Sequence, residues 1–252
     1  MTSSKLLSTS ALLTVLMAGA VFGEDFEVTD PTTTANADLD GSDTLTISST
    51  GSITVSGSGD EFGVGATGDD NALTNEGEIR ITSDTGNNRG AQFGSADGTS
   101  VTNSGTIAIT DTGATGGRNY GVAIEFDASQ NDTPASISNS GNIVINSVYG
   151  SNRGIDIQVA DGVSEATMDG LSVENTGLIQ ITTTDGGESR GIQLNGYEDS
   201  GNFYDNDSIV YSSLSNSGQI VISATAGGNR GIQKSNISDG SIVNTGAIEI
   251  TS

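Results

Sequence analysis

The sequence predicts an all-β fold, a parallel β-helix (a solenoid) of about seven rungs. Three observations predict it: a short phrase recurs along the chain, apolar and polar residues alternate within it, and insertions are confined to one connection. Such a pattern indicates a coil that repeats along an axis. The 23 Ile against 12 Leu also favour strands, because β-branched side chains fit a pleated sheet.

The first phrase reads Asn, a small or acidic residue, Gly, any residue, Ile, any residue, Ile. It occurs at Asn75–Ile81, Asn103–Ile109, Asn139–Ile145, Asn175–Ile181, Asn216–Ile222 and Asn244–Ile250, and a degenerate copy, Ser49–Val55, has Ser in place of Asn. Asn103, Gly105 and Ile107 share one face by parity, and the residues between them share the other. Each phrase therefore predicts one half-buried strand whose Ile side chains face the core.

A second phrase, an Arg close before a Gly and an alternating run, predicts a second strand in each repeat. From the last Ile to this Arg the spacing is 8 or 9 residues, whereas from the Gly to the next Asn it is 13, 18, 21, 25 and 13 in successive repeats. Two strands per repeat, with no helical pattern between them, leave a parallel β-helix as the simplest closure. Its successive rungs would stack in register at ~4.8 Å, with identical residues above one another.

The asparagines of the first phrase have the same parity as the core Ile residues. We therefore expect them to form an internal amide ladder in which each side chain hydrogen-bonds the next. The ladder comprises Asn75, Asn103, Asn139, Asn175, Asn216 and Asn244.

Five of the six arginines occupy the second phrase and form the predicted arginine column: Arg89, Arg118, Arg153, Arg190 and Arg230. Like charges stacked at ~4.8 Å repel one another unless they are solvated or neutralised. Asp84, Asp111 and Asp185 lie in the preceding turns and are candidate partners. The column has two interpretations. It caps turn carbonyls at a corner of the coil, or it forms a stripe that binds an anionic glycan.

The longest insertion gathers aromatic and acidic residues, which are Tyr197, Glu198, Asp199, Phe203, Tyr204, Asp205 and Asp207. Aromatics beside carboxylates suit sugar stacking, and the carboxylates could also hold Ca²⁺ through hard oxygen ligands. The same loop could instead fold its aromatics onto the rod. No other cofactor and no other metal is expected. We expect this insertion and those at 127–136 and 160–171 to project side by side as one binding patch.

Composition excludes several function classes. With no His and no Cys, the chain lacks a Ser-His-Asp or Cys-His nucleophile, an imidazole or thiolate metal site and any disulfide. A formal net charge of −24 argues against binding nucleic acid or an anionic membrane surface. The function classes that remain are chemistry that needs only carboxylates and the binding of a partner or a cation.

The amino terminus has the pattern of a targeting segment. Lys5 precedes an apolar stretch over residues 11–22, which Glu24 and Asp25 follow. The stretch is too short to span a bilayer and fits a signal peptide. We expect a signal peptide at 1–23, a cap or entry segment at 24–44, and the β-helix at 45–252 in an exported protein.

The repeats resemble the passenger regions of bacterial autotransporters and related large surface proteins of type V secretion. The resemblance rests on Asn-Ser-Gly-x-Ile-x-Ile followed by Gly-Ile-x-Leu, as at 216–222 and 191–194, and covers about residues 45–252. It implies a right-handed β-helix displayed on, or secreted from, a Gram-negative cell. The role implied is adhesion or a structural stalk, with a glycan or protein of a host or neighbouring cell as partner.

Two further expectations follow. The family's translocator barrel does not follow Ser252, so we expect a longer natural chain or end-to-end self-association of the terminal rung. The alternative function is a carbohydrate-active enzyme, a polysaccharide hydrolase or lyase that uses paired Asp such as Asp205. An active site should interrupt the repeats, and the regular core rungs favour a non-enzymatic role.

Overall fold

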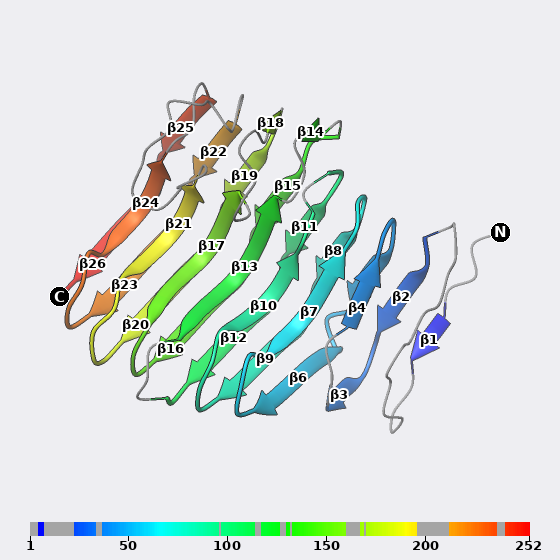
Figure 1. The fold of residues 1–252 in the computed structure, drawn as a ribbon, viewed down its shortest axis with the longest axis horizontal. Helices are drawn as coiled ribbons and strands as arrows, with labels where there is room; N and C mark the ends of the chain where they lie inside the picture. Colours follow the sequence, from blue (N-terminus) through cyan, green and yellow to red (C-terminus); the bar gives the residue numbers. More distant parts are fainter. Residues whose placement is uncertain are drawn as a thin grey trace.

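The computed structural model describes residues 5–7, 23–33, 37–95, 97–113, 117–126, 130–131, 133–159, 167–168, 170–195, 212–235 and 240–252. In these residues the chain is all-β, and three parallel sheets wind into a rod (Figure 1). The predicted parallel β-helix is confirmed. Nowhere in the described ranges is there a helix of the length and apolarity needed to cross a membrane.

Sheet A has nine strands and runs the length of the rod. Its strands, in order, are β1 (Lys5–Leu7), β2 (Asp25–Val28), β5 (Thr44–Ile47), β8 (Ala72–Asn75), β11 (Ser100–Asn103), β15 (Ser136–Asn139), β19 (Ser172–Asn175), β22 (Ser212–Asn216) and β25 (Gly240–Asn244).

Sheet B has eight strands: β3 (Pro31–Thr33), β6 (Ser52–Gly57), β9 (Glu78–Ser83), β12 (Thr106–Asp111), β16 (Asn142–Ser147), β20 (Leu178–Thr183), β23 (Gln219–Ala224) and β26 (Ala247–Thr251). Sheet C has seven: β4 (Ala37–Asp40), β7 (Phe62–Thr67), β10 (Asn88–Phe93), β13 (Arg118–Phe126), β17 (Ser151–Val159), β21 (Ser189–Asn195) and β24 (Arg230–Ser235). A short fourth sheet joins β14 (Gln130–Asn131) to β18 (Thr167–Met168).

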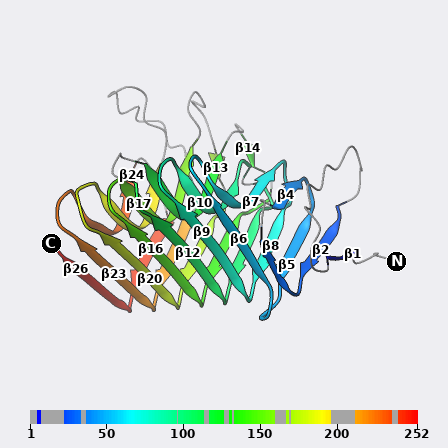
Figure 2. The ribbon, with the colours of Figure 1, turned by 90° about the horizontal axis from the view of Figure 1, so that it is seen from below.

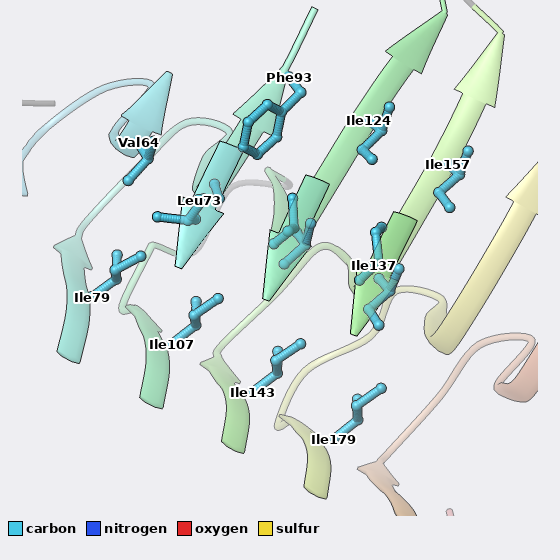
Figure 3. Packing of buried hydrophobic residues seen from close by; sticks show 14 of the residues in the cluster. Val64, Leu73, Ile79, Phe93, Ile107, Ile124, Ile137, Ile143, Ile157 and Ile179 are labelled. Atoms are coloured by element: carbon cyan, nitrogen blue, oxygen red, sulfur yellow. The ribbon is translucent and has the colours of Figure 1, made fainter. Parts of the chain in front are cut away.

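The core consists of apolar side chains stacked rung upon rung. Ile107 pairs in register with Ile79 on one side and Ile143 on the other, and all three are fully buried. Figure 3 shows this row continuing to Ile179, facing the side chains of sheets A and C. Thr106 and Ala108, the outward neighbours of Ile107 in β12, are only half-buried, so the predicted assignment of faces is correct.

The prediction of two strands per repeat is wrong, because each full coil has three. The first phrase is divided by a corner: β11 ends at Asn103, and β12 begins at Thr106. The turn at Ser104–Gly105 takes two residues, so parity continues across it and hides the bend. Gly105 is required there, because a Cβ would lie 2.1 Å from the Gly77 carbonyl oxygen.

The first coil begins before residue 45. Strands β2, β3 and β4 pair with β5, β6 and β7, so the segment expected as a cap or entry already contributes to all three sheets. The degenerate phrase is shifted: Ile47, not Ser49, pairs with Asn75. Its corner is two residues longer, since Ile53 still pairs with Ile79. Most of the predicted signal peptide, residues 8–22 included, lies outside the described residues.

The asparagine ladder runs inside the rod along six rungs. Each side-chain Nδ2 donates to the Oδ1 of the next rung over 2.6 to 2.7 Å, from Asn75 to Asn103, Asn139, Asn175, Asn216 and Asn244 in turn. The first acceptor, Asn75 Oδ1, has no partner, because Ile47 occupies the preceding rung.

A second ladder, which the sequence analysis did not identify, runs along sheet C. Asn88 Nδ2 donates to Asn119 Oδ1, and Asn119 Nδ2 donates to Asn152 Oδ1, both at 2.8 Å. Asn152 continues to Thr183 Oγ1 at 2.8 Å. Each of these hydrogen bonds joins two coils in a dry interior, where an unpaired amide is costly.

Asn139→Ala should therefore destabilise the rod by about 2 to 4 kcal/mol, since Asn103 Nδ2 loses its short hydrogen bond to Asn139 and Asn175 Oδ1 loses its donor. Asn146→Ala, an amide on the exposed face of β16, is the control and should change stability by less than about 0.5 kcal/mol. Urea unfolding followed by circular dichroism measures both. Equal losses would mean that the ladder contributes no more than a surface amide.

Candidate functional site: the outer face of sheet C

A column of glycines changes the direction of side chains along sheet C. In β17, Arg153 faces outward, Ile155 and Ile157 face the core, and Asp156 lies between them on the outer face. The phase shifts at Gly154, where a Cβ would lie 2.3 Å from Ile179 Cγ2. Arg153 and Asp156, three positions apart, therefore both face outward and lie close together.

The outward residues directly before these glycines form a single row across sheet C, here called the arginine–tyrosine row. In rung order it is Phe62, Arg89, Tyr120, Arg153, Arg190 and Arg230. The predicted arginine column is therefore wrong at one position: Arg118 pairs with Ser151, and Tyr120 takes its place. Aligning the phrases on Asn and Gly, as in Asn119-Tyr120-Gly121, would have found this.

Tyr120 separates two arginines that would otherwise be stacked. Its ring lies between Arg89 and Arg153, with each guanidinium carbon 5.3 Å from the ring centroid. Arg89 also lies over the ring of Phe62 at 5.2 Å. Arg153 Nη1 donates to the Tyr120 hydroxyl at 3.1 Å. Cation–π contacts of this kind contribute roughly 0.5 to 2 kcal/mol each.

The remaining arginines find other partners. Arg153 lies 3.4 Å from Asp156, and its Nε donates to Gln193 Oε1. Arg190 forms an ion pair with Glu188. Arg230 Nη1 donates to the Gly228 carbonyl at 3.2 Å, which is the capping of a turn that one interpretation predicted.

In the part of the chain that the structure describes, the turn acids expected to pair with the arginines form no ion pair with them. Asp111 accepts from Asn119 Nδ2 at 3.0 Å and from the Gly113 amide at 2.9 Å, so it stabilises the second ladder. Asp84 and Asp185 form no ion pair with the row among the described residues. Burial, followed by repulsion from Arg153, lowers the pKa of Arg190.

Asp156 is the group that the sequence analysis missed. It is only 1% exposed although it lies on the outer face, and neither carboxylate oxygen has a hydrogen bond. Burial raises its pKa from 3.8 to about 6, against the lowering effect of the arginines that face it from β10, β13, β17 and β21. Desolvation therefore outweighs the attraction of Arg153 at 3.4 Å.

The insertions leave the rod from the strands of this sheet. Strands β14 and β18 belong to the first two insertions and pair in parallel, Gln130 with Thr167. The described strands of these two insertions therefore lie side by side, and Figure 2 shows β14 next to β13 at the edge of the rod. The aromatic and acidic cluster from Tyr197 to Asp207 lies outside the described residues. Within the described ranges, no three acidic side chains gather so that they could hold a metal ion.

The arrangement combines fixed cations with buried, unfilled hydrogen-bond acceptors on one face of a rigid sheet. Such a face can bind a ligand that has both an anionic group and hydrogen-bond donors. Comparison of the chain with protein-family models, curated proteins and solved structures finds no match.

Asp156→Asn should stabilise the protein in a pH-dependent way. Folding raises the pKa of Asp156 from 3.8 to about 6. The free energy of unfolding of the native protein therefore falls as the pH rises from 3.8 through 6, and it stays lower above that range. Removing the ionisable group should restore up to about 3 kcal/mol at pH 8 and little at pH 4, because one unit corresponds to about 1.4 kcal/mol.

Thermal unfolding of both proteins at the two pH values measures this difference. Asp84→Asn, in an exposed turn, is the control and should have little effect at either pH. A gain for Asp156→Asn that is as large at pH 4 as at pH 8 would contradict the assignment.

Proposed function

We propose that this protein is a surface-displayed or secreted bacterial passenger of the type V secretion kind, acting as an adhesin or structural rod. One observation supports it most: five arginines, two aromatic rings and five of the seven buried polar atoms that lack a hydrogen-bond partner among the described residues share the outer face of sheet C, beside the bases of the insertions. The outer face of sheet A carries mostly small polar side chains, such as Thr46, Thr74 and Thr102.

The rod suits a role in presenting this face. Its core rungs are regular along the described length, so the binding groups are held on strands whose positions are fixed by pairing on both sides. The long connections leave the same strands, where they can extend the contact without disturbing the core. The partner is a glycan or protein on a host or neighbouring cell.

A carbohydrate-active enzyme is the second candidate, and the observation that favours it is Asp156. An acid whose pKa is near 6 could protonate a leaving group. A glycoside hydrolase also needs a second carboxylate at a defined separation. The acid identified nearby, Glu188, is already paired with Arg190. Turnover of a polysaccharide that Asp156→Asn abolishes would make this the better assignment.

Attachment to cells tests the first proposal. Beads coated with the protein should bind target cells, and the double variant Arg153→Gln/Arg190→Gln should weaken attachment about tenfold or more, because charged hydrogen bonds are lost. Arg80→Gln, which removes one arginine from the outer face of sheet B, is the control and should leave attachment unchanged. Equal attachment by all three proteins would reject the sheet C face.

A further inference from the structure

Unpartnered polar atoms are concentrated on three neighbouring strands. Among the described residues, seven buried side-chain polar atoms lack a hydrogen-bond partner. Two of them, Asn75 Oδ1 and Asn88 Oδ1, are the first acceptors of the two ladders. The other five are both carboxylate oxygens of Asp156, Arg190 Nε, Asn195 Oδ1 and Gln233 Oε1, which belong to β17, β21 and β24.

Register places these five atoms on one face. Asp156 pairs with Gln193, and Gln193 pairs with Gln233, so they form one row across the three strands. Asn195 lies two residues beyond Gln193 and points to the same face. Arg190 lies three residues before Gln193 and also faces outward, because the change of side-chain direction at Gly191 falls between them. Buried polar groups are normally satisfied, and a cluster of exceptions needs an explanation such as a ligand.

The chemistry of the five atoms indicates what would satisfy them. Four are acceptors and one is a donor, so the complementary ligand must supply several donors. Arg153 and Arg190 already pair with Asp156 and Glu188. Arg190 Nε still lacks a hydrogen-bond partner, and the adjacent Arg230 forms no ion pair among the described residues, so these two guanidinium groups can take an anion in addition. A molecule with several hydroxyls and a carboxylate has both properties, because hydroxyls donate to the acceptors and a carboxylate fits the planar guanidinium fork.

We propose that the outer face of β17, β21 and β24 binds a sugar that carries a carboxylate, such as a uronic acid residue of an acidic polysaccharide. The carboxylate contacts Arg190 and Arg230, and the hydroxyls donate to Asp156, Asn195 and Gln233. This ligand class rests on the proposed function, since it makes the sheet C face the adhesive one.

The extent of the site favours a glycan chain over a small molecule. Three adjacent strands span about 10 Å along the rod, and the arginine–tyrosine row continues beyond them. Arg230, the last member of the row, is exposed, so a chain lying along the rod can reach the row from that end. A neutral sugar would leave Arg230 without a counter-charge among the described residues, and an inorganic anion would leave the four acceptors without donors.

Calorimetry with the full chain tests the ligand class. A trimer of galacturonic acid should bind, whereas the same trimer with its carboxylates reduced to alcohols should bind at least about tenfold more weakly. Arg190→Gln and Arg230→Gln should each weaken binding of the acidic trimer several-fold, and Arg80→Gln should not. Because Arg230 is exposed, its variant keeps the test valid if Arg190→Gln fails to fold.

Asp156→Ala gives the sharpest result, because the two explanations of the face predict opposite signs. If the arginines attract the ligand by charge alone, removing a negative group should strengthen binding of the acidic trimer. If Asp156 accepts sugar hydroxyls, the same change should weaken it several-fold. Stronger binding by Asp156→Ala would therefore overturn the proposed contacts.

The remaining outcomes separate this inference from the proposed function. Equal affinity for the acidic and reduced trimers, or binding of a sulfated but not a carboxylated sugar, overturns the ligand class. Attachment to cells that depends on Arg153 and Arg190, without affinity for the trimer, also overturns the ligand class and leaves the adhesive role standing. Attachment to cells that is unchanged when Arg153 and Arg190 are both replaced would instead reject the adhesive role of this face.

Discussion

In-register parallel stacking is the constraint on which the rest of this structure depends. Each residue of a rung lies over its counterpart in the next, so a side chain that recurs must pack against copies of itself. Ile satisfies this requirement by apolar contact, as in the stack through Ile79, Ile107 and Ile143. Asn satisfies it because one amide both donates and accepts. The interior therefore uses two kinds of self-complementary side chain.

Arginine does not satisfy this requirement, and the structure shows the compensation. Tyr120 replaces an arginine in the middle of the row and presents a face to each neighbour. Asp156 occurs where the row resumes, beside Arg153. Repetition explains the scaffold, whereas departures from repetition lie where charges need partners and where a ligand could be held.

The repeat period and parity were sufficient to predict the fold, because both follow from stacking itself. The corner at Ser104–Gly105 could not be predicted from them, since a two-residue bend leaves the alternation intact. The burial of Asp156 was hidden for the opposite reason. The phase shift at Gly154 places it three residues from Arg153 on one face, where simple alternation would separate the two. Parity fails at the glycine, and the candidate site lies at that glycine.

The charge distribution would make the proposed binding of an acidic glycan to sheet C selective. The chain has a formal net charge of −24, so its acidic surface repels a polyanion at long range. At physiological ionic strength that repulsion is screened beyond about 8 Å, whereas contacts within the row are not. An acidic glycan bound as proposed would therefore gain nothing from general attraction and would be held only where it meets the guanidinium groups and the unfilled acceptors together. Specificity would then come from this short-range fit, because the rest of the rod opposes binding.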